Sequence, residues 1–258
     1  MHLFRTLLVP ALVVALAGCR APVTPKTFKG STDDLYRFAK REYDRRKWEN
    51  AVSGFERLTL ELPVRDTLLP RSHYYLGMAH LGRKEYLLAA QAFSRLAESF
   101  PDDTLADDGY YRSGRAYQRM WRRPDLDAQY GETALATYQT LLSAYPDSPL
   151  AADARKQVAT LEQWFATKDY DNGMHYFRRK AYDSAILYFK GVTVRYPQTP
   201  RARDAYLRLV EAYRAIRYTE DARDACQTLH RTYPGDRDVR AHCGPGPQVS
   251  DSAPTPVP

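Results

Sequence analysis

The sequence predicts an all-α protein, an α-solenoid of five helical hairpins with one long extra helix after the third hairpin. Three observations predict this fold. An aromatic residue or leucine stands directly before a proline at five places, an alanine lies twelve residues before each proline, and a small residue recurs farther upstream in four repeats. The alanines and prolines pair as Ala51 with Pro63, Ala89 with Pro101, Ala134 with Pro146, Ala185 with Pro197 and Ala222 with Pro234.

The spacing inside each repeat predicts a helix that ends at the proline. A bulky residue lies four positions after the alanine and an aliphatic residue seven positions after it, so the three share one helix face. Proline cannot continue a helix and therefore closes it. The bulky residues are Phe55, Phe93, Tyr138, Phe189 and Cys226, and the aliphatic residues are Leu58, Leu96, Leu141, Val192 and Leu229.

A partner helix is predicted upstream of each of these helices. Together the two helices resemble the tetratricopeptide repeat, a 34-residue helix-turn-helix unit that stacks into a superhelix. The third repeat carries about eight extra residues, 122–129, between its helices. The small position holds Ala39, Gly77, Gly114, Gly173 and Val210, and three residues later come Glu42, His80, Tyr117, Tyr176 and Tyr213. Four residues depart from the pattern. Glu42, His80 and Cys226 stand where an aromatic residue is usual, and Val210 stands where a small residue is usual.

Residues 1–18 are predicted to be a lipoprotein signal peptide. Arg5 supplies a positive start, and residues 7–16 form an apolar run that is too short to span a bilayer, which needs about 20 residues. The small residues before Cys19 resemble the lipobox of bacterial lipoproteins, which implies cleavage before Cys19 and its lipidation. The alternative is an ordinary signal peptide with a chance cysteine. Arg20, where aspartate would favour retention at the inner membrane, indicates delivery to the outer membrane.

An apolar stripe at helical spacing interrupts the repeat period. It predicts a helix that starts near Pro149 and continues through about Arg179, joining two blocks of repeats. We expect N-caps at Ser31, Thr104, Ser148, Thr199 and Thr219. The stripe consists of Leu150, Ala154, Val158, Leu161 and Phe165. The predicted divisions are a lipidated tether (19–30), an N-terminal block of three repeats (31–146), the long helix with a C-terminal block of two repeats (147–234), and a disordered tail rich in proline, glycine, serine and threonine (235–258).

The net charge of +7 comes from 38 basic and 31 acidic residues. A basic surface could meet nucleic acid, anionic lipid or acidic proteins. Export argues against nucleic acid, and arginines occur along every predicted helix, so a solvated surface is the simpler interpretation. Beyond Cys19, the sequence has Cys226 and Cys243, which an exported protein can oxidise to a disulfide. The alternative is a buried Cys226 with a free thiol in the tail.

No catalytic, cofactor or metal-binding motif is present. The histidines form no H-E-x-x-H or other metal-ligand spacing, and the sequence has no P-loop, no G-x-G-x-x-G after a strand and no G-x-S-x-G. The pairs Asp102 with Asp103 and Asp107 with Asp108 lie at a predicted helix start, where the helix dipole favours acidic residues. We therefore expect a binding protein without cofactors rather than an enzyme.

The first helices of the hairpins are expected to line a concave groove that binds an extended peptide. Tyrosine, methionine and arginine, which protein interfaces favour, recur on that face. Repeats of this kind also carry tyrosine there for purely structural reasons, so both interpretations stay open. The candidate groove residues are Tyr36, Tyr43, Tyr74, Met78, Tyr111, Arg115, Tyr170, Met174, Phe177 and Arg178.

The signal, tether, five repeats and long helix after the third repeat, in this order, resemble the BamD (YfiO-type) family of outer-membrane β-barrel assembly lipoproteins. The most specific pieces are residues 145–154, 176–182 and 196–205. The resemblance implies a lipid-anchored, non-enzymatic subunit on the periplasmic face of the outer membrane. Its N-terminal repeats, 31–146, would receive C-terminal signals of unfolded barrel proteins. Its C-terminal part, 149–233, would contact the periplasmic domains of a BamA-like insertase, beside other assembly subunits.

Two other functions compete with this one. A periplasmic adaptor lipoprotein for cell-wall synthesis or division is built from similar repeats, but many such proteins carry an N-terminal coiled coil, and no heptad pattern precedes residue 31. A glycan- or nutrient-binding lipoprotein would be expected to show exposed tryptophan clusters, whereas Trp48, Trp121 and Trp164 are dispersed in the sequence.

Overall fold

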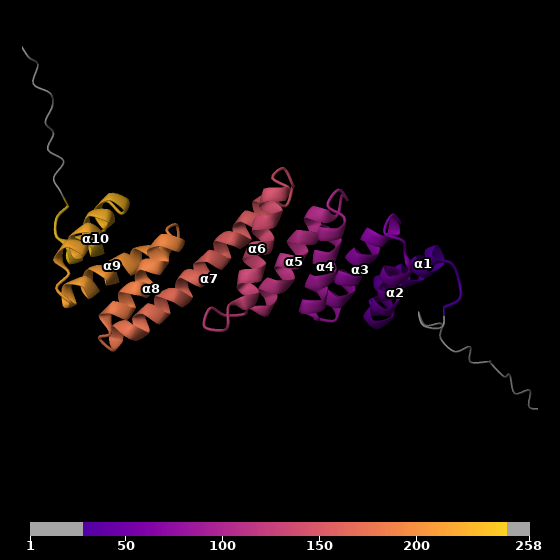
Figure 1. Ribbon diagram of the computed structural model, residues 1–258, viewed down its shortest axis with the longest axis horizontal. Helices are drawn as coiled ribbons and strands as arrows, with labels where there is room; N and C mark the ends of the chain where they lie inside the picture. Colours follow the sequence, from indigo (N-terminus) through magenta and orange to yellow (C-terminus); the bar gives the residue numbers. More distant parts are fainter. Residues whose placement is uncertain (1–27, 247–258) are drawn as a thin grey trace, which may run out of the picture.

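The computed structural model describes residues 28–246 and shows a right-to-left succession of antiparallel helices (Figure 1). The described residues form helices only, without any strand. Cys19, the signal peptide and most of the tether lie outside the described residues, as does the tail from residue 247. The helices are α1 (Thr32–Asp44), α2 (Trp48–Glu61), α3 (Leu68–Gly82), α4 (Tyr86–Ser99), α5 (Ala106–Met120), α6 (Gln129–Ala144), α7 (Ala151–Arg178), α8 (Tyr182–Arg195), α9 (Pro200–Ala215), α10 (Thr219–Thr232) and α11 (Arg237–Cys243).

The predicted repeat register is confirmed by how the helices of each hairpin meet. A Cβ atom placed on Gly77 of α3 would lie 2.7 Å from the ring of Phe93 in α4. The same relation joins Gly114 to Tyr138, at 2.8 Å. Because the small residue leaves room for the ring, the backbones of the two helices approach closely. The apolar residues then form a chain of clusters along the whole array rather than one central core.

Two of the predicted N-caps are confirmed and three are wrong. Ser31 caps α1 through a reciprocal pair of hydrogen bonds with Asp34, and Thr199 stands at the N-cap of α9. Thr104 lies one residue before the observed N-cap of α5, Leu105, and Ser148 lies two residues before that of α7, Leu150. In both connections the chain makes an additional turn after the proline, so the helix begins later than predicted. Thr219 is the first residue of α10 and not its cap.

The long helix is confirmed as α7, which has 28 residues and would measure about 42 Å. Trp121, in the loop between α5 and α6, is 1% exposed and packs against α7. Its ring centroid lies 4.5 Å from that of Phe165 and 5.5 Å from that of Trp164, so two of the tryptophans that are dispersed in the sequence meet in the fold. Tyr196 also stacks on Phe165, with ring centroids 6.2 Å apart. These rings join the two blocks of repeats.

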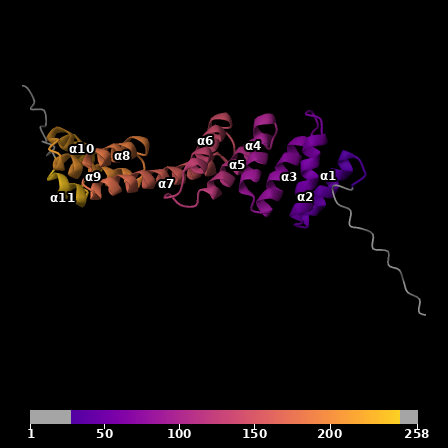
Figure 2. The ribbon, with the colours of Figure 1, turned by 60° about the horizontal axis from the view of Figure 1, so that its bottom comes forward.

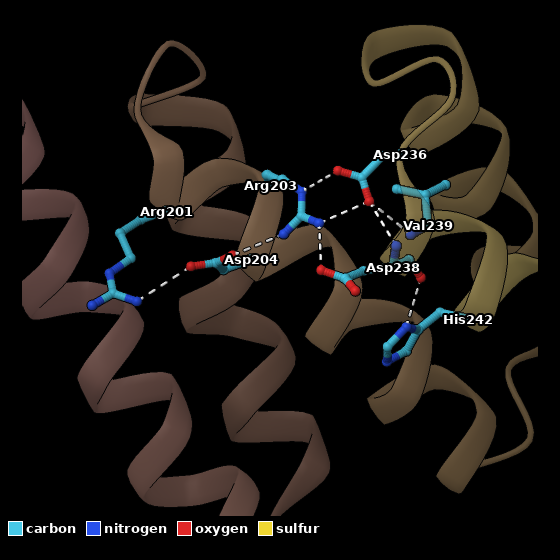
Figure 3. Close-up of polar contacts among 7 residues, drawn as sticks. All are labelled: Arg201, Arg203, Asp204, Asp236, Asp238, Val239 and His242. Atoms are coloured by element: carbon cyan, nitrogen blue, oxygen red, sulfur yellow. Dashed lines mark hydrogen bonds and ion pairs between the residues drawn. The ribbon is translucent and has the colours of Figure 1, made fainter.

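The prediction of a disordered tail from residue 235 is wrong for residues 237–243, which form α11. Asp236 caps this helix by accepting hydrogen bonds from the backbone N–H groups of Asp238 and Val239. Arg203 of α9 donates two hydrogen bonds of 2.8 Å to Asp236 and one of 2.7 Å to Asp238 (Figure 3). These bonds from Arg203 hold the pKa of Asp236 well below its usual range. The helix is thus held by an ion pair that its short sequence does not reveal.

A covalent link also holds α11. Cys226 of α10 and Cys243 at the end of α11 form a disulfide in the structure, with their Cα atoms 5.5 Å apart. Val239 is 1% exposed and closes the last apolar cluster together with Val210 and Leu229. The array therefore ends in a short capping helix that covers the apolar side of the fifth hairpin.

The molecule is elongated in both views, with α7 spanning the gap between the two blocks (Figures 1 and 2). Since successive helices are antiparallel, the turns inside hairpins lie on one long edge and the connections between hairpins lie on the other. Figure 1 shows the first set along the lower edge and the second set along the upper edge, most clearly from α3 to α10.

Candidate peptide-binding groove

Two pairs of consecutive first helices contact each other. Helix α1 contacts α3, and α7 contacts α9, whereas no comparable contact joins consecutive second helices among the described residues. At these two places the first helices approach each other more closely than the second helices do, which is compatible with a groove lined by first helices. The candidate residues on these helices remain a prediction, and their surroundings can be described helix by helix.

Tyr36 and Tyr43 of α1 belong to an aromatic cluster that centres on Tyr75 of α3. The ring of Tyr75 stacks on Phe55 at 5.6 Å and meets Tyr43 edge to face at 5.2 Å. The ammonium of Lys40 lies 5.1 Å from the centroid of the same ring. Tyr36 and Tyr43 are half-buried, and burial raises the pKa of both phenols. Each tyrosine therefore packs one side of its ring inside the array and leaves the remainder accessible.

Tyr74 and Met78 of α3 are bridged by Arg112 of α5. The guanidinium carbon of Arg112 lies 5.2 Å from the centroid of the Tyr74 ring, and its Nη1 lies 3.4 Å from Sδ of Met78. Asp108 accepts a hydrogen bond of 2.8 Å from Nε of Arg112. Burial raises the pKa of the Tyr74 phenol to about 12, so its hydroxyl remains a donor at neutral pH. Arg112 is a fixed positive charge in the floor of the groove.

Tyr111 and Arg115 of α5 lie at the mouth of a hollow of about 200 Å³. Nη1 of Arg115 is 3.3 Å from the hydroxyl of Tyr111, which accepts its hydrogen bond. Leu81 and Ala116 supply the apolar part of the lining, and Arg112 and Arg119 add two more cations. A hollow that combines an apolar floor with several guanidinium groups suits a peptide segment that carries both an apolar side chain and a carboxylate.

Tyr170, Met174 and Phe177 of α7 form a separate section of the predicted groove. Tyr170 is 8% exposed and packs on Phe189, and Arg201 lies 4.8 Å from the centroid of its ring. Phe177 is covered in the same way by Arg208, at 5.8 Å. Arg178 is exposed, with its Nε donating to the carbonyl oxygen of Met174.

The structure divides the predicted groove residues into two sections. Tyr36, Tyr43, Tyr74, Met78, Tyr111 and Arg115 follow one another on α1, α3 and α5, and the residues of α7 lie in a different apolar cluster. A second hollow, of about 280 Å³, adjoins Tyr170 between α9 and α11. It is lined by acidic as well as basic groups, including Glu211 and His242, which are joined by a contact of 2.8 Å. The two sections therefore differ in charge as well as in position.

Sequence reasoning missed the two residues that organise the first section, Tyr75 and Arg112. Each directly follows a residue that was predicted, Tyr74 or Tyr111, and neighbouring residues of a helix point in directions about 100° apart. Arg112 could have been found from Asp108, because residues four apart on a helix pair readily and the combination is acidic then basic.

Residues 28–246 contain no group of histidine, cysteine and acidic side chains arranged to hold a metal ion. Within the same residues, no helix combines the length and the apolar character that crossing a bilayer requires.

The chain is similar to known proteins over most of its length. The YfiO family model, described as outer membrane lipoprotein, matches residues 29–229. A protein of Caulobacter vibrioides named outer membrane protein assembly factor BamD is 28% identical over 234 residues, which are 89% of this chain and 76% of that protein. A protein of the same name from Xylella fastidiosa is 26% identical over 246 residues, 90% of this chain and 82% of that protein.

Among solved structures, a TPR repeats protein of Bacteroides fragilis is similar over 83% of this chain and 96% of that chain, with 14% identity and a TM-score of 0.49.

Proposed function

The chain belongs to the YfiO family of outer membrane lipoproteins, and from this membership we propose that it is a non-catalytic subunit of the machinery that assembles proteins into the outer membrane. The observation that carries the proposal is the extent of the match, which runs from residue 29 to residue 229 and so includes α1 to α9 and most of α10. The relatives named as assembly factors support this role over that of a cell-wall or division adaptor.

The N-terminal block, residues 31–146, is proposed to receive unfolded barrel proteins. The aromatic cluster around Tyr75 and the hollow beside Tyr111 present ring faces, a fixed cation at Arg112 and exposed cations at Arg115 and Arg119. An extended chain end with aromatic side chains and a terminal carboxylate would bury its rings on the tyrosines and pair its carboxylate with a guanidinium. This chemistry supports a client segment at the C-terminus of a barrel protein.

The C-terminal block, residues 147–234, is proposed to bind the periplasmic domains of a BamA-like insertase and so act as a scaffold. The mixed charges around Tyr170 and Glu211 offer donors and acceptors of both signs, which suits a folded partner better than a peptide of one charge. Other assembly subunits would bind at surfaces outside the two sections of the groove.

The protein is proposed to be anchored in the outer membrane, on its periplasmic face, by lipid on Cys19. The sequence before Cys19 supports this anchor, and the finding that no described helix suits a bilayer crossing is compatible with it. Two or more acyl chains would hold the protein firmly, because each buried CH₂ contributes about 0.8 kcal/mol.

A pull-down of the lipidated protein from envelopes in mild detergent tests the proposal. We expect near-stoichiometric recovery of a large β-barrel protein with periplasmic repeat domains, identified by mass spectrometry. Recovery of cell-wall or division enzymes without such a barrel would refute the assembly role and leave the fold unaffected. A variant with Tyr170→Ala and Arg208→Ala should lose the barrel protein while keeping clients bound to the N-terminal block.

A further inference from the structure

The two long edges of the solenoid carry opposite charge. The turns inside the five hairpins, which are residues 45–47, 83–85, 121–128, 179–181 and 216–218, hold ten basic and three acidic residues, a net charge of +7. The connections between hairpins and before α11 hold one basic and five acidic residues, a net charge of −4. The positive residues are thus not scattered at random over the ends of the helices. They form one row along the lower edge of Figure 1, which we call the cationic edge.

Four of these turns place a cation where the backbone favours glycine. Arg46, Lys84, Lys180 and Arg217 have φ angles of 58° to 65°, in the left-handed region. Each follows a helix C-cap, and the hydrogen bonds are those of a Schellman motif; in the first turn, Arg46 N–H donates to Tyr43 and Lys47 N–H to Glu42. Glycine occupies this position most readily because it has no Cβ. Since a lysine or arginine is strained there, the same choice in four turns indicates a use for the charge.

The cations of this edge are largely unneutralised within the described part of the chain. Six of them are exposed and form no ion pair within residues 28–246, whereas Arg203, near the opposite edge, is bound to three carboxylates. The six are Arg46, Lys84, Arg122, Arg179, Lys180 and Arg217.

Exposed apolar side chains lie among these cations. Leu87 and Leu88 at the start of α4 and Leu126 in the α5–α6 loop are 37%, 46% and 39% exposed. With Met120 they line an open hollow of about 590 Å³ whose rim holds Lys84, Arg119 and Arg122. Three cations and one carboxylate, that of Glu85, line this hollow beside the apolar side chains. Exposed apolar residues next to cations match the chemistry of a lipid surface, which presents anionic headgroups above hydrocarbon.

We propose that the cationic edge lies against an anionic lipid membrane surface. The row runs along five hairpins, on the order of 80 Å at helix spacings of about 9 Å, which exceeds the reach of a single peptide groove. The ten basic residues of these turns outnumber the three acidic ones, as binding to an anionic surface requires. The nine residues from Cys19 to Phe28 can span at most about 32 Å, so a lipid on Cys19 would keep Phe28 within that distance of the bilayer. The cationic edge begins at the far end of α1, which is roughly 20 Å long. The tether is therefore long enough for this edge to reach the membrane.

Sedimentation with lipid vesicles tests the proposal. Residues 19–258 carrying Cys19→Ser keep every described helix and lack the lipid site, so any binding comes from the protein surface. We expect binding to vesicles with 30% phosphatidylglycerol, little binding to pure phosphatidylcholine, and loss of binding in 0.5 M salt, which shortens the Debye length. The variant with Arg46→Gly, Lys84→Gly, Lys180→Gly and Arg217→Gly should bind at least tenfold more weakly, since each cation at an anionic surface strengthens binding about fivefold.

The four glycine substitutions should not unfold the protein, because glycine adopts the positive φ angle at these positions without strain. We therefore expect the melting temperature to remain constant or to rise. The matched control removes four exposed arginines near the opposite edge, Arg65→Gln, Arg71→Gln, Arg155→Gln and Arg231→Gln, and so has the same net charge. It should keep binding within about threefold. An equal loss in both variants, equal binding to neutral vesicles, or retention of an acidic protein without any vesicle binding would overturn the proposal.

Discussion

Gly173 of α7 and Phe189 of α8 meet so closely that a Cβ atom on the glycine would lie 2.5 Å from Cε1 of the ring. Side chains cannot stand at that distance, so the ring would have to move, and its space is bounded by other buried residues such as Ala185 and Val192. The pair therefore sets the spacing between α7 and α8, and equivalent pairs set it in the second and third hairpins.

The substitution Gly173→Ala should lower the free energy of unfolding by about 1–3 kcal/mol, the usual effect of overpacking a filled core. Urea denaturation followed by circular dichroism measures it. Gly191→Ala in α8 is the matched control, because the added Cβ would meet only the flexible end of Arg195. That substitution should be neutral or stabilising by up to about 1 kcal/mol. Equal effects at both positions would show that the close contact is not real.

Tyr111→Ala combined with Arg115→Ala should weaken the binding of a barrel protein's C-terminal peptide at least tenfold, since both line the hollow in the N-terminal block. Fluorescence anisotropy with a labelled peptide measures the affinity. Tyr188→Ala combined with Lys190→Ala changes the same residue classes on α8 and should leave the affinity unaltered. A groove variant that binds as tightly as the unaltered protein would place the client site elsewhere.

Stability should fall as the pH drops from about 6.5 to about 4, in part because of His73. Burial, assisted by Arg95, lowers the pKa of His73 to about 4. Over this range the unfolded chain binds a proton that the folded chain excludes, so the folded state loses free energy relative to it, by at most about 1.4 kcal/mol per pH unit and less for a partly exposed ring. His73→Gln should flatten the dependence of urea midpoints on pH. An unchanged slope would assign the acid sensitivity to other groups.

Cys243→Ser should loosen α11 without disturbing the N-terminal block. A disulfide that closes a loop of this size typically contributes about 3 kcal/mol, and in a repeat array such a loss remains near its source. Hydrogen exchange should accelerate in residues 237–243 and stay constant in α1 to α6. The ion pair of Arg203 with Asp236 should preserve part of the helix, so Arg203→Gln added to Cys243→Ser should release it fully.

Cys19→Ala should abolish stable membrane attachment, because the contact of the cationic edge with lipid depends on charge and weakens in salt. Fractionation in 0.5 M salt separates the two contributions, since salt screens the cationic edge but does not extract acyl chains. A Cys19→Ala protein that remains with the membrane in high salt would show that another anchor exists.

The repeat register could be predicted from sequence because it depends on local spacing. Ala89, Phe93 and Leu96 share a helix face whatever surrounds them, and all three are buried. The helix that carries each groove residue could be predicted, but the side chains that it contacts could not. Tyr75 and Arg112 gain their roles from rings on other helices, those of Tyr43 and Tyr74.

Features that depend on distant contacts could not be predicted. Helix α11 has seven residues, too few for a stable isolated helix, and it exists through Arg203 and Cys226, which lie far back in the sequence. The apparent insertion at residues 122–129 likewise conceals the role of Trp121, whose ring occupies space against Gly131. The departures at Val210 and Cys226 also belong together, because both lie in the cluster that α11 closes.

The continuous backbone of α7 couples the N-terminal block of repeats mechanically to the C-terminal block. Its first half packs against α6 and its second half against α8 and α9, so no flexible joint separates the two blocks. Half of α7 measures about 21 Å, and a bend of about 10° at its middle would shift its far end by roughly 4 Å. A partner that tilts one block would consequently displace the other. Binding at one end of the molecule would therefore change the position of the opposite end.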